Sequence, residues 1–292
     1  MVVVTSLSPR SSARPDPGAI VPRSASLALW LWAVSSTEEA AAAAGTVVDD
    51  DEPHQLAGDV PAGLDTPTVG SLFSAWAGRV RSVAAVFPGP GDAMGVPAPV
   101  SARAVDAEEC VLVTVVADAP PAPLVPAGPD APEVLEHWAF APEVERFGSD
   151  LEPGHLVTWH GVRVDPWELR TVGAVGTLDD AQRQLRLGLR EATEALMDLD
   201  VSRWREDAAG IIASLREPVD LRSVLPRGVD ARRAEVFQSA ARLRAIVDLA
   251  TMDDGGAVNL WQADQRSTAL REVDRAARRA MSAATLHVPA DD

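Results

Sequence analysis

The sequence contains no lysine and no tyrosine, and Cys110 is its only cysteine. The missing lysine excludes a phosphate loop of the Walker type, in which a lysine lies beside the bound phosphate. The single cysteine excludes an internal disulfide bond and a zinc site built from cysteines. No apolar run reaches the roughly 18 residues that a membrane-spanning helix requires, so we expect no membrane span.

Positive charge is also scarce, because 26 arginines face 43 acidic residues and leave a net charge of −17. Residues 1–176 hold 23 of the acidic residues and only 9 of the arginines. Such a chain repels polyanions at long range. We therefore expect no nucleic-acid partner.

The segment SLALWLWAV, residues 26–34, follows three arginines and has the composition of the apolar part of an export signal. It lies late in the chain and runs directly into SSTEEAAAAAG without a convincing cleavage site. A cytoplasmic location is therefore the preferred interpretation, and export through 26–34 stays open as the alternative.

Composition divides the chain into three regions. Residues 1–25 mix Ser, Pro and Arg without a period, which predicts a disordered extension. Residues 26–176 are predicted as an α+β region, with a helix over 24–44 and an acidic linker over 47–70. Residues 177–292 are predicted as a helical bundle packed on the sheet.

The middle region contains runs of β-branched residues between Pro and Gly clusters, which predict strands at 80–87, 110–117 and 155–164. A short edge strand at 122–126 and short helices at 70–80 and 101–109 are also predicted. We interpret 118–133 and 132–150 as loops with a helical turn or two.

Apolar residues at spacings of three and four predict four helices in the last region. The first presents a face that begins Leu178, Ala181, Leu185 and Leu189, and the others cover 203–217, 230–254 and 257–285. The predicted fold is therefore α+β: a small, mostly antiparallel β-sheet with short helices, followed by a C-terminal antiparallel helical bundle.

The stretch FPGPGDAMGVPAP, residues 87–99, has the glycines of a loop that binds a phosphate or a metal ion. Its four prolines remove backbone N–H donors, and its glycine spacing does not match the dinucleotide-binding fingerprint. We interpret it as a stiff surface turn in which Asp92 makes local hydrogen bonds. A contact to a ligand or partner centred on Asp92 is the alternative.

The histidines do not form a metal-binding pattern. His155 and His160 lie five apart on a predicted strand, so their side chains point to opposite faces. His54 and His137 lie in acidic segments that predict solvated side chains. We therefore expect no metal and no cofactor, and Cys110, at the head of an apolar strand, is interpreted as a small core residue.

The last predicted helix carries a stripe of Arg271, Arg275 and Arg278, with Arg279 beside them. We interpret this stripe as a solvated face that pairs with Glu272 and Asp274. A contact with an acidic partner, or with the acidic first part of the chain, is the alternative.

Three stretches resemble a family of proteins of unknown function from GC-rich actinobacteria, over residues 26–285. They are FPGPGDAMGVP, ATEALMDLDVSRWREDAAGIIASLR and MDDGGAVNLWQADQRSTALREVDRAARRAMSAA. The resemblance implies a bacterial cytoplasmic protein, and it implies no activity.

No set of catalytic residues converges in the sequence, so the leading hypothesis is a non-enzymatic module for protein interaction or regulation. The alternative is an enzyme or small-molecule binder with a pocket between sheet and bundle, near Asp92, His160 and Trp167. We expect another protein as the partner, bound through a surface that contains Pro88, Gly89, Gly91, Asp92, Gly95, His160 and Trp167.

Overall fold

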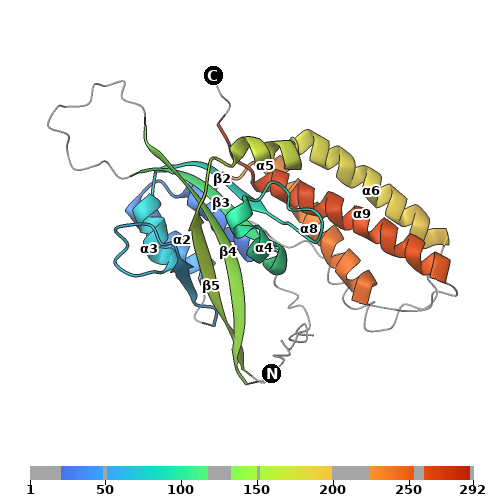
Figure 1. The fold of residues 1–292 in the computed structure, drawn as a ribbon, viewed down its shortest axis with the longest axis horizontal. Coiled ribbons are helices and arrows are strands. Elements are labelled where there is room, and N and C mark those ends of the chain that lie inside the picture. The colour runs from blue at the N-terminus through green and yellow to red at the C-terminus, as the bar shows by residue number, and fades with distance from the viewer. Residues whose placement is uncertain are drawn as a thin grey trace, which may run out of the picture.

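The computed structural model describes residues 21–48, 51–117, 133–149, 152–198, 224–252 and 260–289. A five-stranded sheet has helices on both faces, and three long helices extend from one side of it as an arm (Figure 1). The fold is α+β, as predicted.

The strands lie in the order β1-β5-β4-β3-β2. Parallel pairing joins β1 to β5, and antiparallel pairing joins the other neighbours, so the sheet is mixed. The bounds are β1 (His54–Gly58), β2 (Val80–Val86), β3 (Cys110–Val116), β4 (Leu135–Gly148) and β5 (Pro153–Arg163).

Two of these strands correct predictions. β1 lies inside 47–70, which was predicted as a linker, and β4 fills most of 132–150, which was predicted as loop. β4 tolerates Pro142 because the pairing with β3 ends at Phe140, so no strand lies beside Pro142 on that side.

Eight helices are described: α1 (Arg23–Ala33), α2 (Thr37–Val47), α3 (Val69–Trp76), α4 (Ala98–Ala107), α5 (Glu168–Val175), α6 (Leu178–Asp198), α8 (Ala231–Met252) and α9 (Leu260–Thr285). The single helix predicted over 24–44 is therefore two. Ser36 starts the second one, since its side chain accepts from Glu39 N while the Glu39 carboxylate accepts from Ser35 N.

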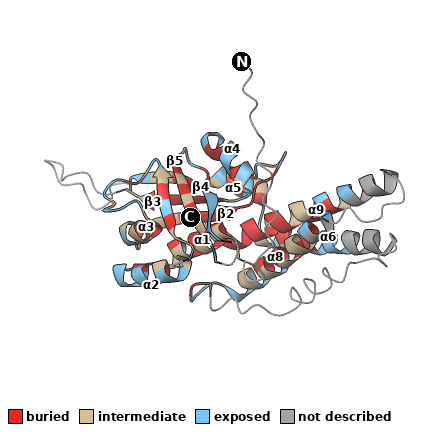
Figure 2. Cartoon of the chain, turned by 90° about the horizontal axis from the view of Figure 1, so that it is seen from below, coloured by how far each residue is buried: buried red, intermediate tan, exposed pale blue. Residues whose placement is uncertain are grey.

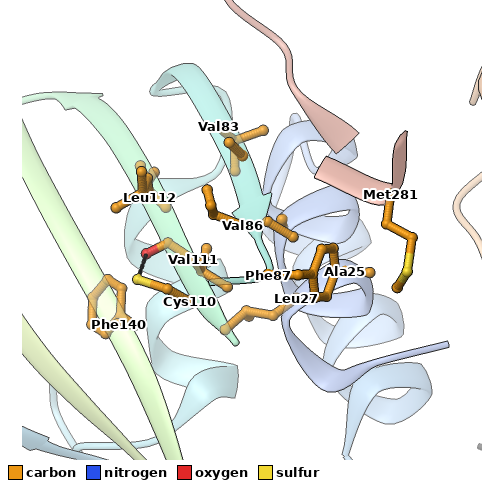
Figure 3. Close-up of a cluster of buried hydrophobic side chains, with 14 of the residues drawn as sticks. Ala25, Leu27, Val83, Val86, Phe87, Cys110, Val111, Leu112, Phe140 and Met281 are labelled. Atoms are coloured by element: carbon orange, nitrogen blue, oxygen red, sulfur yellow. Dashed lines mark hydrogen bonds between the residues drawn. The ribbon is translucent and has the colours of Figure 1, made fainter. Parts of the chain in front are cut away.

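The sheet is covered on both faces. Figure 2 shows α1, α2 and α3 on one side of it and α4 and α5 on the other. On the first side, Trp76 of α3 packs against Trp138 and Phe140 of β4. Phe87, Ala25 and Leu27 of α1 and Met281 of α9 belong to one cluster of buried side chains (Figure 3), so the main core also includes the last helix.

The arm consists of α6, α8 and α9. Antiparallel packing of α8 on α9 is set by Arg233, which bonds to the end of α9, and by Arg244, which lies near Asp274. The predicted helices at 230–254 and 257–285 are confirmed. The face predicted for α6 is wrong at Leu189, which is 50% exposed, since Gly188 packs on α9 in its place.

The predicted strand at 122–126 and the predicted helix at 203–217 lie outside the described residues. Among the helices that the structure describes, none combines the length and the apolar character needed to cross a membrane.

Candidate functional site at the junction of sheet and helices

The outer edge of β2 is paired by the end of α9 instead of by another strand. Thr285 Oγ1 accepts a hydrogen bond from Ala85 N at 3.1 Å and lies 3.0 Å from Ala85 O. Two residues along the edge, the backbone of His287 exchanges two hydrogen bonds with that of Val83, at 2.8 and 2.9 Å. These contacts satisfy backbone groups that an exposed edge strand leaves open.

The same seam continues at Phe87. Ser282 Oγ accepts from Phe87 N at 3.3 Å, and Arg278 Nη1 donates to Phe87 O at 3.0 Å. Arg278 is only 6% exposed, and its Nε donates to Asp274 at 2.7 Å. The prediction of a solvated arginine face is therefore wrong for Arg278. We call the contacts of β2 and Phe87 with Arg278, Ser282, Thr285 and His287 the edge seam.

The loop that follows Phe87 begins with a tight turn. Gly89 and Asp92 exchange two backbone hydrogen bonds, at 2.9 and 3.0 Å. Pro90 and Gly91 occupy the two central positions, and Gly91 has a φ of +78°, as a type II turn requires. Asp92 Oδ1 accepts from Met94 N at 3.3 Å, which is the local hydrogen bond predicted for this aspartate.

Loop 88–99, whose last two residues already belong to α4, packs on two other helices. On α9, Arg275 and Arg279 lie 3.6 and 3.5 Å from Asp92 Oδ2, so the alternative contact of the arginines with the acidic first part of the chain is confirmed. On α5, the backbone of Thr171 approaches Gly95 so closely that a Cβ there would lie 2.8 Å from its Cα. The loop is thus a wedge between α5 and α9.

The residues predicted to share one binding surface lie at different depths. Trp167 is 1% exposed, and Pro88 and Gly89 are also buried. Gly91 is exposed at the tip of the turn, and Asp92 and Gly95 are half-buried. His160 lies on β5, where its Nε2 is 2.8 Å from Glu143 of β4.

A polar cluster that the sequence interpretation missed lies where α5 begins. Thr114 of β3, His137 of β4 and Glu168 of α5 converge there, each mostly buried. Thr114 Oγ1 is 2.8 Å from His137 Nδ1 and also bonds to the Glu168 carboxylate. The prediction of a solvated His137 in a loop is therefore wrong.

The hydrogen bonds of this polar cluster fix the proton positions. A carboxylate accepts only, so the single hydroxyl proton of Thr114 goes to Glu168. His137 Nδ1 must then carry a proton and donate it to Thr114. In the neutral imidazole, the other ring nitrogen, Nε2, is then an acceptor, and no described residue bonds to it. The arrangement orients one imidazole through a hydroxyl and a carboxylate.

Two buried polar atoms lie close by in the sequence, on the start of α5. Neither Trp167 Nε1 nor Thr171 Oγ1 has a hydrogen-bond partner among the described residues. Buried polar groups of this kind are uncommon in native proteins. The start of α5 therefore combines an oriented histidine with unsatisfied donors.

The burial of His54 and Cys110 in the structure tests the predictions made for these two residues. His54 is 5% exposed, not solvated, with Nδ1 accepting from Trp159 and Nε2 bonded to Glu52. Cys110 is a buried core residue, as predicted, and burial raises the pKa of its thiol to about 12. Within the described ranges, no three His, Cys, Asp or Glu side chains gather in a metal-binding arrangement.

Comparison with known proteins gives a family. A family model described as "Rv1486c-like protein, N-terminal domain" matches residues 24–172, and one described as "Rv1486c-like protein, C-terminal domain" matches residues 179–282. No curated protein and no solved structure matches the chain. The first match ends within α5 and the second begins at the start of α6. In the edge seam, Phe87 of the first matched region contacts Arg278 and Ser282 of the second, and Thr285 and His287 lie just after the second.

Proposed function

The chain belongs to the Rv1486c-like family, and we propose that it is a non-enzymatic module for protein interaction or regulation. Its partner is another protein, bound by the surface that loop 88–99 forms with the outer face of α5.

The observation that carries this proposal is the exposure of Leu169. This side chain is 86% exposed on α5, and Val172, one turn further on, is also exposed. The helix that presents them is fixed, because Glu168 bonds to Thr114 and Thr171 packs on Gly95. Burying one leucine stabilises a complex by about 2 kcal/mol, and neighbouring exposed apolar side chains are a feature of protein interaction sites.

We also propose a cytoplasmic location, and a division of the chain into an α+β region, residues 26–176, and a helical bundle, residues 177–292. Supporting the location, the candidate export segment 26–34 lies mostly in α1, where Leu27, Ala28 and Leu31 are buried in the core. Cleavage after this segment would remove a core helix. A processed start after residue 34, found by mass measurement of the protein from native cells, would contradict it.

A photo-crosslinking residue placed at position 169 tests the interaction. We expect it to capture one defined protein in native cells, and the same residue at position 147, on exposed Phe147, to capture none of it. In a chain with the crosslinker at 169, Val172→Asp should abolish the adduct because a charge is introduced into the apolar contact. Equal capture from both positions would contradict the proposed surface.

A second function, binding of a small polar molecule, is supported by the polar cluster of Thr114, His137 and Glu168. A ligand with an O–H or N–H donor would bond to His137 Nε2. NMR of the His137 ring during addition of small alcohols and amines tests this, with the ring of His160 as the control. Unchanged His137 resonances throughout the set would exclude this function.

A further inference from the structure

The last described residues, 286–289, form a short segment on the edge of β2, which we call the C-terminal clasp. Its backbone pairing with the sheet is made by His287 alone, which exchanges two hydrogen bonds with Val83. The imidazole of His287 stacks on Trp32 of α1, with ring centroids 4.9 Å apart and an interplanar angle of 25°. One residue therefore joins the clasp to a strand and to a helix.

The hydrogen bonding of this imidazole fixes which nitrogen takes an added proton. Nδ1 lies 3.0 Å from the carbonyl oxygen of Thr285, and a carbonyl only accepts, so Nδ1 already carries hydrogen. Protonation therefore occurs at Nε2 and converts a neutral stacked ring into a cation.

The surroundings of His287 do not favour that cation. It is faced by Trp32 of α1, Val83 of β2, Thr285 of α9 and Arg233 of α8, of which only Arg233 is charged. Arg233 is held there by bonds to the carbonyl oxygens of Ala283 and Ala284 in α9. It also donates at 2.8 Å to the carbonyl oxygen of Leu286, the first residue of the clasp. Burial lowers the pKa of His287 below 6.5, the bond to Thr285 partly opposes this, and the charge of Arg233 lowers it further.

We propose that the C-terminal clasp is a proton-sensitive device: protonation of His287 releases residues 286–289 from β2 and exposes the strand edge at Val83 together with the Trp32 ring. Because the docked pKa lies below the free value of 6.5, docking is complete above that pH and weakens as the pH falls through the docked pKa. An edge opened in this way can pair with another strand. The device does not depend on the proposed role of α5.

Hydrogen exchange of the Val83 amide tests the device, since this N–H donates to His287. Protection factors, which correct for the intrinsic effect of pH on exchange, are measured from about pH 7.5 to about pH 5. In the unmodified chain we expect the protection of Val83 to fall several-fold, while that of Val113 in central strand β3 stays constant. His287→Phe keeps an aromatic ring against Trp32 and cannot be protonated, so its Val83 protection should not change with pH.

The control is His155→Gln, which removes a half-buried histidine from β5 and should leave the pH dependence of Val83 as it is. The proposal is overturned if the protection of the Val83 amide falls equally with pH in His287→Phe. It is also overturned if this protection does not fall with pH in the unmodified chain. If His287→Phe fails to fold, NMR titration of the His287 ring in the unmodified chain decides. A midpoint at or above 6.5 overturns the device, and one below 6.5 that coincides with the loss of Val83 protection supports it.

Discussion

Arg278 Nη1 of α9 lies 3.0 Å from the carbonyl oxygen of Phe87, at the point where β2 passes into loop 88–99. A Cβ on Gly89 would lie 2.9 Å from the same nitrogen, so glycine leaves the space in which the guanidinium lies. The same side chain bonds to Asp274. A single buried arginine therefore couples the sheet, the loop and the last helix.

Replacing Arg278 by Met should lower the free energy of unfolding by about 2 kcal/mol, because Phe87 O and the carboxylate of Asp274 lose a charged donor. Urea denaturation followed by tryptophan fluorescence measures this loss. Arg271→Met is the matched control, since Arg271 is exposed and its bonds to described residues stay within its own helix, to Ser267 and Thr268. Equal losses in the two variants would show that the buried bond contributes nothing specific.

Alanine substitutions at Gly95 and Gly91 distinguish the energetic cost of backbone strain from the cost of close packing. Both have a positive φ, +80° and +78°, but an added Cβ meets nothing within 4 Å at Gly91 and would lie 2.8 Å from Thr171 Cα at Gly95. Gly91→Ala should destabilise by about 1 kcal/mol, from the left-handed conformation alone. Gly95→Ala should destabilise by about 3 kcal/mol, because α5 must also move. Thermal unfolding of both variants measures the difference, and similar midpoints would contradict the wedge.

Helices and strands that show a pattern of apolar residues in their own segment could be predicted from the sequence. β3 reads as a continuous apolar run because both its faces are buried. The helix α8 was predicted over 230–254 from apolar residues at spacings of three and four, and four of these side chains are buried: Val236, Ala240, Leu243 and Val247. Alternation could also have revealed β4, where Trp138 and Phe140 face one side and His137 and Ala139 the other. Pro142 and the acidic residues around it hid that alternation.

The junction could not be predicted in this way, because its contacts join residues far apart in the chain. Thr285 and Ala85 are separated by 200 positions, and Arg278 and Phe87 by 191. A stripe of arginines on a helix is the same pattern whether it faces water or a buried carbonyl group. The polar cluster of Thr114, His137 and Glu168 likewise depends on strand register and on where α5 begins.

Thr285→Val tests the side-chain pairing of the β2 edge. Valine has nearly the shape of threonine but leaves the N–H and C=O of Ala85 without the hydroxyl group. We expect a loss of about 1–3 kcal/mol in the free energy of unfolding, because both groups are buried. Thr285→Ser is the control and should recover most of the stability, since it keeps the hydroxyl group. A serine variant as unstable as the valine variant would assign the effect to the lost methyl group.

Because the pKa of Glu52 is lowered in the folded protein, we expect the fold to lose stability in acid. Burial raises its pKa, but hydrogen bonds and charges from His54 and Arg23 outweigh burial and lower the pKa from 4.5 to about 2. A carboxyl group whose pKa is lower in the folded state stabilises the fold above its unfolded pKa. This contribution is therefore complete above pH 4.5 and is lost as the pH falls from 4.5 to about 2. Unfolding free energies measured across that window should fall less steeply in Glu52→Gln than in the unmodified chain. The exposed Glu145→Gln should follow the unmodified chain, and a Glu52→Gln curve parallel to the unmodified one would show that the pair with Arg23 is not linked to folding.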